Sequence, residues 1–270
     1  MPALFIRDGD RLVPTGLARG GWAEDTQHGG PPCGVLASAI EATRAPVPMQ
    51  TVRLTFDLFR PVPMAPLHTT TRIVRDGKRI QVIDAYLHNG EVTIARAAAL
   101  RIRTKPTELP PHVAQLDRLA PGHSPADGLP VGDRWIRAED RLERFYVDAI
   151  EARSLDDSFI RGVPGKTWFR LKAQLVEGEE TSRLVALATI ADMANGNAAV
   201  LDPQEWLFVN PDLTLYIHRL PVGEWVGMDS RPHPRSTGVG VADTLVYDEE
   251  GAVGRIVQSQ LIERHDGHRW

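Results

Sequence analysis

The stretch Leu54–Val62 has the sequence LTFDLFRPV, and Leu213–Val222 has the sequence LTLYIHRLPV, so one pattern occurs twice with a single inserted residue, Leu220. A second matched pair, Tyr86–Arg103 and Tyr247–Arg264, follows in the same order. The offset between the copies is 159 residues for the first pair (213 − 54) and 161 for the second (247 − 86). Two matched segments at nearly one offset predict a duplicated unit of about half of the chain.

The first copy predicts one helix followed by an antiparallel sheet. Pro31 and Pro32 fit the first turn of a helix, where a backbone N–H has no partner within the helix. Apolar residues then recur at helical spacing until Pro46, which ends the helix. Asn-Gly and Asp-Gly pairs tolerate the positive φ of tight hairpin turns, and they occur at residues 76–77 and 89–90. Alternating segments around these turns predict strands at residues 51–59, 69–74, 80–87 and 92–103.

A connector rich in proline and glycine joins the two copies, with its turn-forming residues concentrated between residues 105 and 132. We therefore expect a first unit at residues 1–104, a connector at 105–140 and a second unit at 141–270. In the second unit we expect a helix at 183–192, which Asn195-Gly196 interrupts before 198–201. The expected strands of this unit lie near residues 141–152, 167–175, 206–218, 224–230, 239–247 and 253–263.

The composition limits the classes of function. Hydrophobic residues make up 42% of the 270 residues and charged residues 24%, as in globular proteins with a buried core. A net charge of −4 does not favour a nucleic-acid partner. No apolar run is long enough to span a bilayer, and the start MPALFIRDGD lacks the pattern of a secretory signal, so we expect a cytoplasmic protein without a membrane partner. Cys33 is the single cysteine, which excludes an internal disulfide and a Cys-rich metal site; we expect neither a metal nor a cofactor.

Four segments in order resemble one known family. They are HGGPPCGVLASAIEA (His28–Ala42), LFRPV (Leu58–Val62), DLTLYIHRLPVGEW (Asp212–Trp225) and GRIVQSQ (Gly254–Gln260). With these segments the chain resembles the acyl-CoA thioesterase II family and its thioesterase-like relatives, over both halves. The resemblance implies an α+β double hotdog, in which two tandem helix-plus-sheet units form one pseudo-dimeric domain. It also implies an acyl-CoA substrate, whose thioester is hydrolysed by a water that an Asp, a Gln and a Ser or Thr hold in place.

Asp212 and Gln258 match the first two of these positions. From the residues themselves, Asp212 in Asn210-Pro211-Asp212 also fits a turn aspartate, and Gln258 also fits a polar strand face. The duplicate distinguishes both, because the first copy has Arg53 and Ala97 at the matched positions. Alternation places Gln258 on one face with its second neighbours, where a buried amide would need hydrogen-bond partners.

The third position of the implied site has no hydroxyl residue. The ungapped match is His233, which leaves the role open among Ser230, His233, Ser236 and Thr237. We take His233 and Thr237 forward as catalytic candidates beside Asp212 and Gln258.

The start of the first helix is the candidate oxyanion site. Helix N-termini offer unpaired N–H groups and a positive partial charge, which can stabilise the oxyanion formed when water attacks a thioester. Because prolines cannot donate, the useful donors would be Gly30 and Cys33, with His28 orienting the substrate or serving only as a loop residue.

Two other functions remain open at this point. One is an acyl-CoA binder that lost hydrolysis, which the missing hydroxyl favours. The other is a double-hotdog enoyl-CoA hydratase, for which Asn210-Pro211 with His218 is a weak match. By analogy with other hotdog sheets we expect a homo-oligomer.

Overall fold

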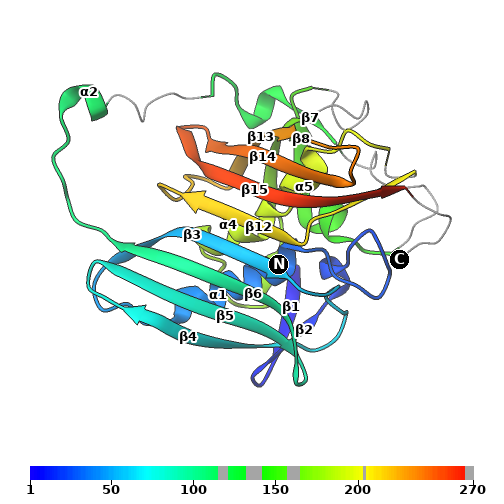
Figure 1. Ribbon diagram of the computed structural model, residues 1–270, viewed down its shortest axis with the longest axis horizontal. Coiled ribbons are helices and arrows are strands. Elements are labelled where there is room, and N and C mark those ends of the chain that lie inside the picture. The colour runs from blue at the N-terminus through cyan, green and yellow to red at the C-terminus, as the bar shows by residue number, and fades with distance from the viewer. Residues whose placement is uncertain (115–120, 132–141, 157–164, 203–204, 265–270) are drawn as a thin grey trace.

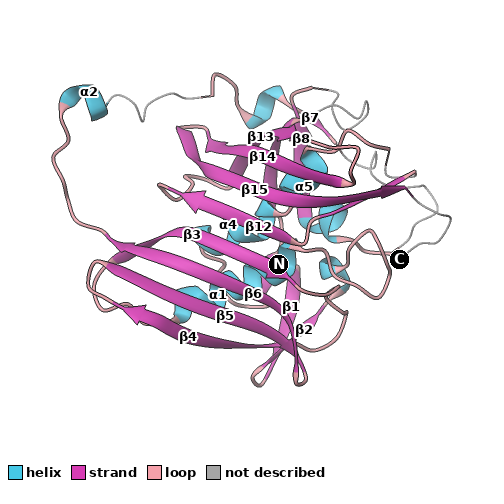
Figure 2. Ribbon diagram, viewed as in Figure 1, coloured by secondary structure: helices cyan, strands magenta, loops and turns pink. Residues whose placement is uncertain are grey.

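The computed structural model describes residues 1–114, 121–131, 142–156, 165–202 and 205–264. The strands of both units lie side by side in one large sheet, and helices cover one of its faces (Figure 1). Strands make up most of the regular structure (Figure 2). Of the described helices, none is long and apolar enough to cross a membrane.

The first unit has the helix and the four strands that its sequence predicts. Helix α1 ends where the chain approaches Pro46, and its buried face includes Cys33, Leu36 and Ile40. The helix packs against β4, β5 and β6. The elements are α1 (Gly30–Ala42), β3 (Met49–Leu58), β4 (His68–Asp76), β5 (Ile80–Asn89) and β6 (Val92–Arg103).

The second unit repeats this plan with more short elements. Its helices are η4 (Phe145–Ala149), a π-helix, and α4 (Arg183–Ala191) and α5 (Met193–Asn197). Its strands are β8 (Ile150–Ser154), β9 (Lys166–Leu171), β10 (Gln174–Val176), β11 (Trp206–Val209), β12 (Asp212–Ile217), β13 (Trp225–Pro232), β14 (Val239–Asp248) and β15 (Gly251–Arg264).

Short elements at the N-terminus and in the connecting segment complete the fold. They are β1 (Ala3–Asp8), β2 (Arg11–Pro14), η1 (Gly16–Ala18), α2 (Pro111–Ala114), η2 (Pro125–Asp127) and β7 (Leu129–Pro130). Strand β1 pairs with β2 and with β10 of the second unit, so the N-terminal segment crosses to the other half. Part of the segment expected as a connector, at 115–120 and 132–140, lies outside the described residues.

The two units join through antiparallel pairing of β3 with β12, and the sheet runs in the order β4-β5-β6-β3-β12-β15-β14-β13-β9-β8-β7. In this pair Thr55 lies opposite Thr214, its own counterpart at the offset of 159, and the two hydroxyl oxygens are 3.2 Å apart. A residue can pair with its own copy only on a local two-fold axis. The pseudo-dimer axis therefore passes through the Thr55–Thr214 pair.

The structure corrects three expected elements of the second unit. The strand expected near 141–152 begins as the π-helix η4, and only β8 is extended. The strand expected over 206–218 is two strands, β11 and β12, because Pro211 between them cannot donate to a ladder. The helix expected to restart at 198–201 instead continues through Asn195-Gly196 as α5 and ends at Asn197.

Helices α1 and α4 approach each other closely through two glycines. An added Cβ at Gly34 would overlap Thr189 Oγ1 and lie 2.9 Å from Leu175 Cδ1, and one at Gly30 would overlap Thr189 O and lie 2.8 Å from Phe145 Cε1. Only glycine permits this approach, which brings the start of α1 against the end of α4.

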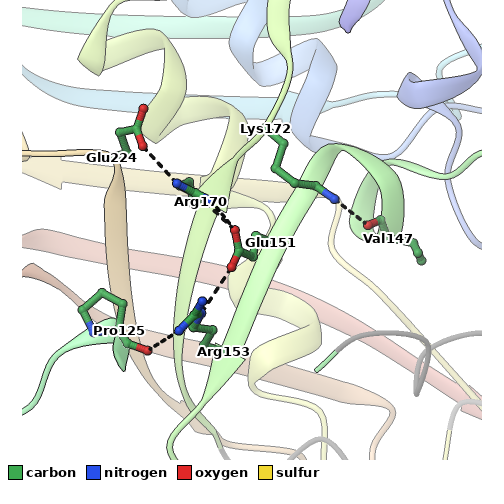
Figure 3. A network of polar contacts seen from close by, with 7 residues as sticks. All are labelled: Pro125, Val147, Glu151, Arg153, Arg170, Lys172 and Glu224. Atoms are coloured by element: carbon green, nitrogen blue, oxygen red, sulfur yellow. Dashed lines mark hydrogen bonds and ion pairs between the residues drawn. The ribbon is translucent and has the colours of Figure 1, made fainter. Parts of the chain in front are cut away.

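A network of ion pairs ties the second unit together away from this junction (Figure 3). Arg170 pairs with Glu151 and Glu224, and Arg153 pairs with Glu151. The Arg153 guanidinium also donates to Pro125 O at 3.5 Å, which holds the end of the connecting segment on β8. These residues are partly exposed, so the network orders the edge of the sheet more than it stabilises the fold.

Candidate active site at the junction of the two units

The most buried charged cluster of the junction is built around Asp192, which ends α4 and begins α5. Its Oδ2 lies 3.0 Å from His28 Nδ1, and its Oδ1 accepts a hydrogen bond of 2.7 Å from Asn210 Nδ2. The backbone N–H of Gly29 also donates to this carboxylate. Gln258 Nε2 lies 3.5 Å from Oδ1. Four donors from both units thus surround one buried carboxylate.

These donors keep Asp192 ionised. Burial by itself raises the pKa of Asp192, but His28, Asn210 and the Gly29 N–H outweigh burial and hold the pKa below its usual value. The positive end of α1 acts in the same direction, because Gly29 is its N-cap.

The sequence around Gly29 allows this contact. A Cβ at Gly29 would lie 2.6 Å from Asp192 Oδ2, so a larger residue would push the carboxylate away from the helix start. The close packing of α1 on α4 then fixes the position of Asp192 along the axis of α1, beside its first turn.

Gln258 points into the same cluster, on the buried face of β15 with Ile256 and Gln260, as alternation predicts. Its side chain is fully buried, and among the described residues no donor reaches its Oε1. The matched residue Ala97 is also fully buried, so the position faces the core in both units. A buried amide oxygen without a partner next to a carboxylate is a place for a bound water.

His28 lies between Asp192 and the π-helix of the second unit. Its ring centroid is 4.8 Å from that of Phe145 and 6.3 Å from that of Tyr146. The side chain keeps 19% of its surface exposed. The sequence left open whether His28 orients the substrate or is an ordinary loop residue. In the structure His28 is part of the buried cluster.

Asp212 lies elsewhere, so the structure does not bring Asp212 and Gln258 together. Asp212 is opposite Asp57 in the β3–β12 ladder, and its Oδ1 accepts a 2.9 Å hydrogen bond from Ser259 N. Neighbouring Leu213 faces the core, so Asp212 faces the other side of the sheet. Asp212 caps the β12–β15 ladder. Arg53 pairs in register with Tyr216, and within the described ranges no ion pair joins it to Asp212.

The hydroxyl and imidazole candidates for the third position do not reach the cluster either. His233, Ser236 and Thr237 are exposed in the connection from β13 to β14. Ser230 is buried, but its hydroxyl bonds Asn197 Nδ2 at 2.8 Å and Thr244 Oγ1 at 2.9 Å. No described contact links any of them to Asp192 or Gln258.

The backbone N–H of Cys33 is already used inside the helix. Its N–H donates to Gly29 O within the helix, at 3.3 Å, so it is not a free oxyanion donor. The thiol is fully buried, and burial and the nearby Asp192 carboxylate raise its pKa well above the usual value. Gly30 N–H lies 3.1 Å from His28 Nδ1 and remains a candidate donor at the helix start.

A second pair of buried polar side chains, Gln260 and Asn195, lies beside a small surface hollow. Gln260 Nε2 donates to Asn195 Oδ1 at 2.7 Å, and Asn195 Nδ2 donates to Phe208 O at 3.0 Å. The hollow beside them is mostly apolar, with Leu201, Phe208, Pro232, Pro234, Gln260 and Ile262 in its lining. The hollow has a volume of about 10 Å³, which is room for about one water.

Sequence reasoning did not select Asp192 and Asn210, which the structure adds as candidate site residues. A signal for Asp192 was available: it follows the apolar run LVALATIA at the C-terminal end of a helix, where a carboxylate is unfavourable. An acid placed there against the helix dipole indicates a specific partner elsewhere. No cluster of three or more ligand-type residues suited to a metal occurs in the described part of the chain.

Two family profiles match this chain. The profile of the acyl-CoA thioesterase N-terminal domain matches residues 18–102, and that of the C-terminal domain matches residues 121–262. The chain belongs to the acyl-CoA thioesterase family. The double hotdog and the thioester hydrolase activity expected from the sequence are thereby confirmed. Among curated proteins, none matches this thioesterase in sequence.

Solved structures share the fold over nearly the whole chain. A provisionally assigned thioesterase II from Thermobifida fusca has a TM-score of 0.70 at 17% identity, with 96% of this chain and 95% of that chain covered. A hotdog protein of unknown function from Alicyclobacillus acidocaldarius has a TM-score of 0.67 at 15% identity, with 98% of this chain and 96% of that chain covered. The acyl-CoA thioesterase II TesB2 from Mycobacterium marinum has a TM-score of 0.64 at 15% identity, with 98% of this chain and 96% of that chain covered. At these identities the likeness concerns the fold.

Proposed function

We propose that this thioesterase hydrolyses a fatty or other acyl-CoA with a water held between Asp192 and Gln258. One observation carries the proposal. Oδ1 of the ionised, buried Asp192 lies 3.5 Å from Gln258 Nε2, and the carbonyl oxygen of Gln258 has no donor among the described residues. A water donating to the amide oxygen would satisfy it and lie beside the start of α1, with its second proton left for a base in the same cluster.

The start of α1 is the natural place for the thioester carbonyl in this proposal. Its positive partial charge would stabilise the negative oxygen of the tetrahedral intermediate, with the Gly30 N–H as the donor. In this proposal Asp212, which accepts a hydrogen bond from Ser259 N, is not a catalytic residue.

Release of free CoA tests the proposal. The purified protein should release thiol from a panel of short, medium and long acyl-CoAs, detected with a thiol reagent. Replacing Asp192 with Asn should lower kcat/KM by roughly 100-fold or more, because the positioned base or orienting carboxylate is lost. If no acyl-CoA in a broad panel is turned over, the proposal is wrong, and binding of acyl-CoA without turnover would favour the non-catalytic binder.

The His28–Asp192 pair favours one second candidate, an enoyl-CoA hydratase, because hydration of a double bond also needs a proton donor and acceptor. The same panel separates the two functions. Hydration of a 2-enoyl-CoA removes its conjugated absorbance without releasing thiol, whereas hydrolysis releases thiol from saturated and unsaturated acyl-CoAs alike. A role in lipid metabolism, a cytoplasmic location and a homo-oligomeric state stay predictions.

A further inference from the structure

The geometry points to His28 as the residue that moves the proton in this hydrolysis, with Asp192 as its orienting carboxylate. The inference rests on the proposed function and assigns a role within the same site. In the second unit none of the described hydroxyl or imidazole candidates reaches Asp192 and Gln258. His28, which belongs to the first unit, takes the third position beside these two residues.

The proton on His28 can be assigned from its neighbours. Nδ1 lies 3.0 Å from Asp192 Oδ2 and 3.1 Å from Gly30 N, and one nitrogen cannot donate to the first while accepting from the second. Because Asp192 is ionised, an unprotonated Nδ1 would place a lone pair against a carboxylate. The charge-assisted bond is the stronger, so we assign the proton to Nδ1, facing Asp192. Gly30 N–H then has no acceptor on His28.

This assignment leaves Nε2 with a lone pair. In the described part of the chain no group bonds Nε2, and the side chain keeps 19% of its surface exposed beside the Phe145 ring. A carboxylate that fixes the tautomer and a free opposite nitrogen are what a general base of the His–Asp type needs.

Asp192 itself is poorly suited to accept the proton. It already accepts from His28, Asn210 and Gly29, and its pKa is held below the usual value, which weakens it as a base near neutral pH. The titratable groups that face His28 are Asp192 at the end of α4, Tyr146 of η4 and, across Asp192, Cys33 of α1. Of these, Asp192 has a pKa held below its usual value and Cys33 a pKa raised above its usual value.

Hydrolysis in this site passes through a tetrahedral intermediate. Water attacks the thioester carbon, forming a C–O bond, while Nε2 of His28 takes one water proton and the carbonyl electron pair moves to oxygen. The tetrahedral intermediate then re-forms the carbonyl and the C–S bond breaks. The CoA sulfur leaves with the electron pair and takes the proton from Nε2. The products are the carboxylic acid and the free thiol, and His28 returns to its neutral form.

Three variants test the inference with acyl-CoA as substrate. His28→Gln, which keeps a similar size, should lower kcat/KM by roughly 100- to 10,000-fold, the usual contribution of a general base. His28→Ala should show the same loss, and added imidazole should restore at least tenfold of it. His88→Gln is the matched control, since His88 is a half-buried histidine bound to Thr70 and Thr93 on the sheet, and it should keep the wild-type rate.

The pH dependence gives a readout that a purely structural role would not change. The wild type should lose kcat/KM as the pH is lowered, because a protonated ring accepts no proton. The residual activity of His28→Gln should lack that fall. If the wild type is active and the His28 variants keep its rate, this role is refuted. The role is also refuted if the variants lose activity, imidazole does not restore it and the fall of kcat/KM at low pH is unchanged. Either result refutes this role alone. A wild type that hydrolyses no acyl-CoA refutes the proposed function as well.

Discussion

Gly34→Ala tests how the packing of the two helices sets the site. The new Cβ would overlap the hydroxyl of Thr189, which is fully buried and fixed by a 2.7 Å bond to Val185 O. Overpacking of this kind costs about 1–3 kcal/mol. Replacing a helical glycine with alanine offsets about 1 kcal/mol of that cost. The short Thr189 side chain cannot swing away, so we expect a net loss of about 1–2 kcal/mol.

A chain of this size shifts its Tm by about 2–4 °C per kcal/mol, so Tm should fall by about 2–8 °C. Thr189 lies three residues before Asp192, and pushing α4 away from α1 would also move the carboxylate from His28. A misplacement of about 1 Å can cost roughly 100-fold in rate, so kcat/KM should fall by about tenfold or more.

A double mutant checks the cause. Thr189→Ala alone removes a buried methyl and hydroxyl and should cost about 1 kcal/mol. In Gly34→Ala/Thr189→Ala the new methyl occupies the vacated space, so stability and kcat/KM should return toward wild type, with a coupling of about 1–2 kcal/mol. Ser38→Ala in the same helix is the control and should change little. Thermal unfolding and thiol release measure both effects; a double mutant no better than Gly34→Ala would refute the reasoning.

Two further predictions concern the stability and reactivity of buried groups. Burial by itself raises the pKa of Asp248, but Arg219 and backbone N–H groups outweigh it and hold the pKa below its usual value. Its stabilising effect is therefore present above about pH 4 and is lost as the pH falls toward the folded-state pKa, so Arg219→Met should unfold at a higher pH in an acid titration followed by circular dichroism. Cys33, buried and with a raised pKa, should resist iodoacetamide at pH 8 in the folded protein and react only on unfolding; rapid labelling of the native protein would contradict its placement.

The repeat predicted the fold well because both copies carry strong periodic patterns. The offset of 159 predicted from LTF and LTL is the same relation that pairs Thr55 with Thr214 on the axis. The predictions of single elements were wrong where a local sequence signal competed with tertiary contacts. The strand expected near 141–152 starts as a π-helix whose Asp148 carboxylate accepts from Arg144 N, a contact that alternation does not reveal.

The site was harder to predict because its residues come from different units. Gln258 was found, since comparing copies exposed a polar residue where Ala97 is buried. Asp212 was chosen because it heads a matched strand, but strand alternation turns it away from Gln258. The contact of Asp192 with His28 joins residues 164 positions apart (192 − 28), through the packing of α1 on α4. No spacing within either copy encodes that contact.

The central claim is that the working carboxylate is Asp192 and that Asp212 is a strand cap. The most direct measurement compares the rate of CoA release by Asp192→Asn and Asp212→Asn with that of the wild type, on the acyl-CoA that the wild type turns over fastest. We predict that Asp192→Asn loses roughly 100-fold or more in kcat/KM. Asp212→Asn, which loses only one exposed bond to Ser259 N, should stay within about threefold of wild type. Full activity in Asp192→Asn together with loss in Asp212→Asn would contradict the account.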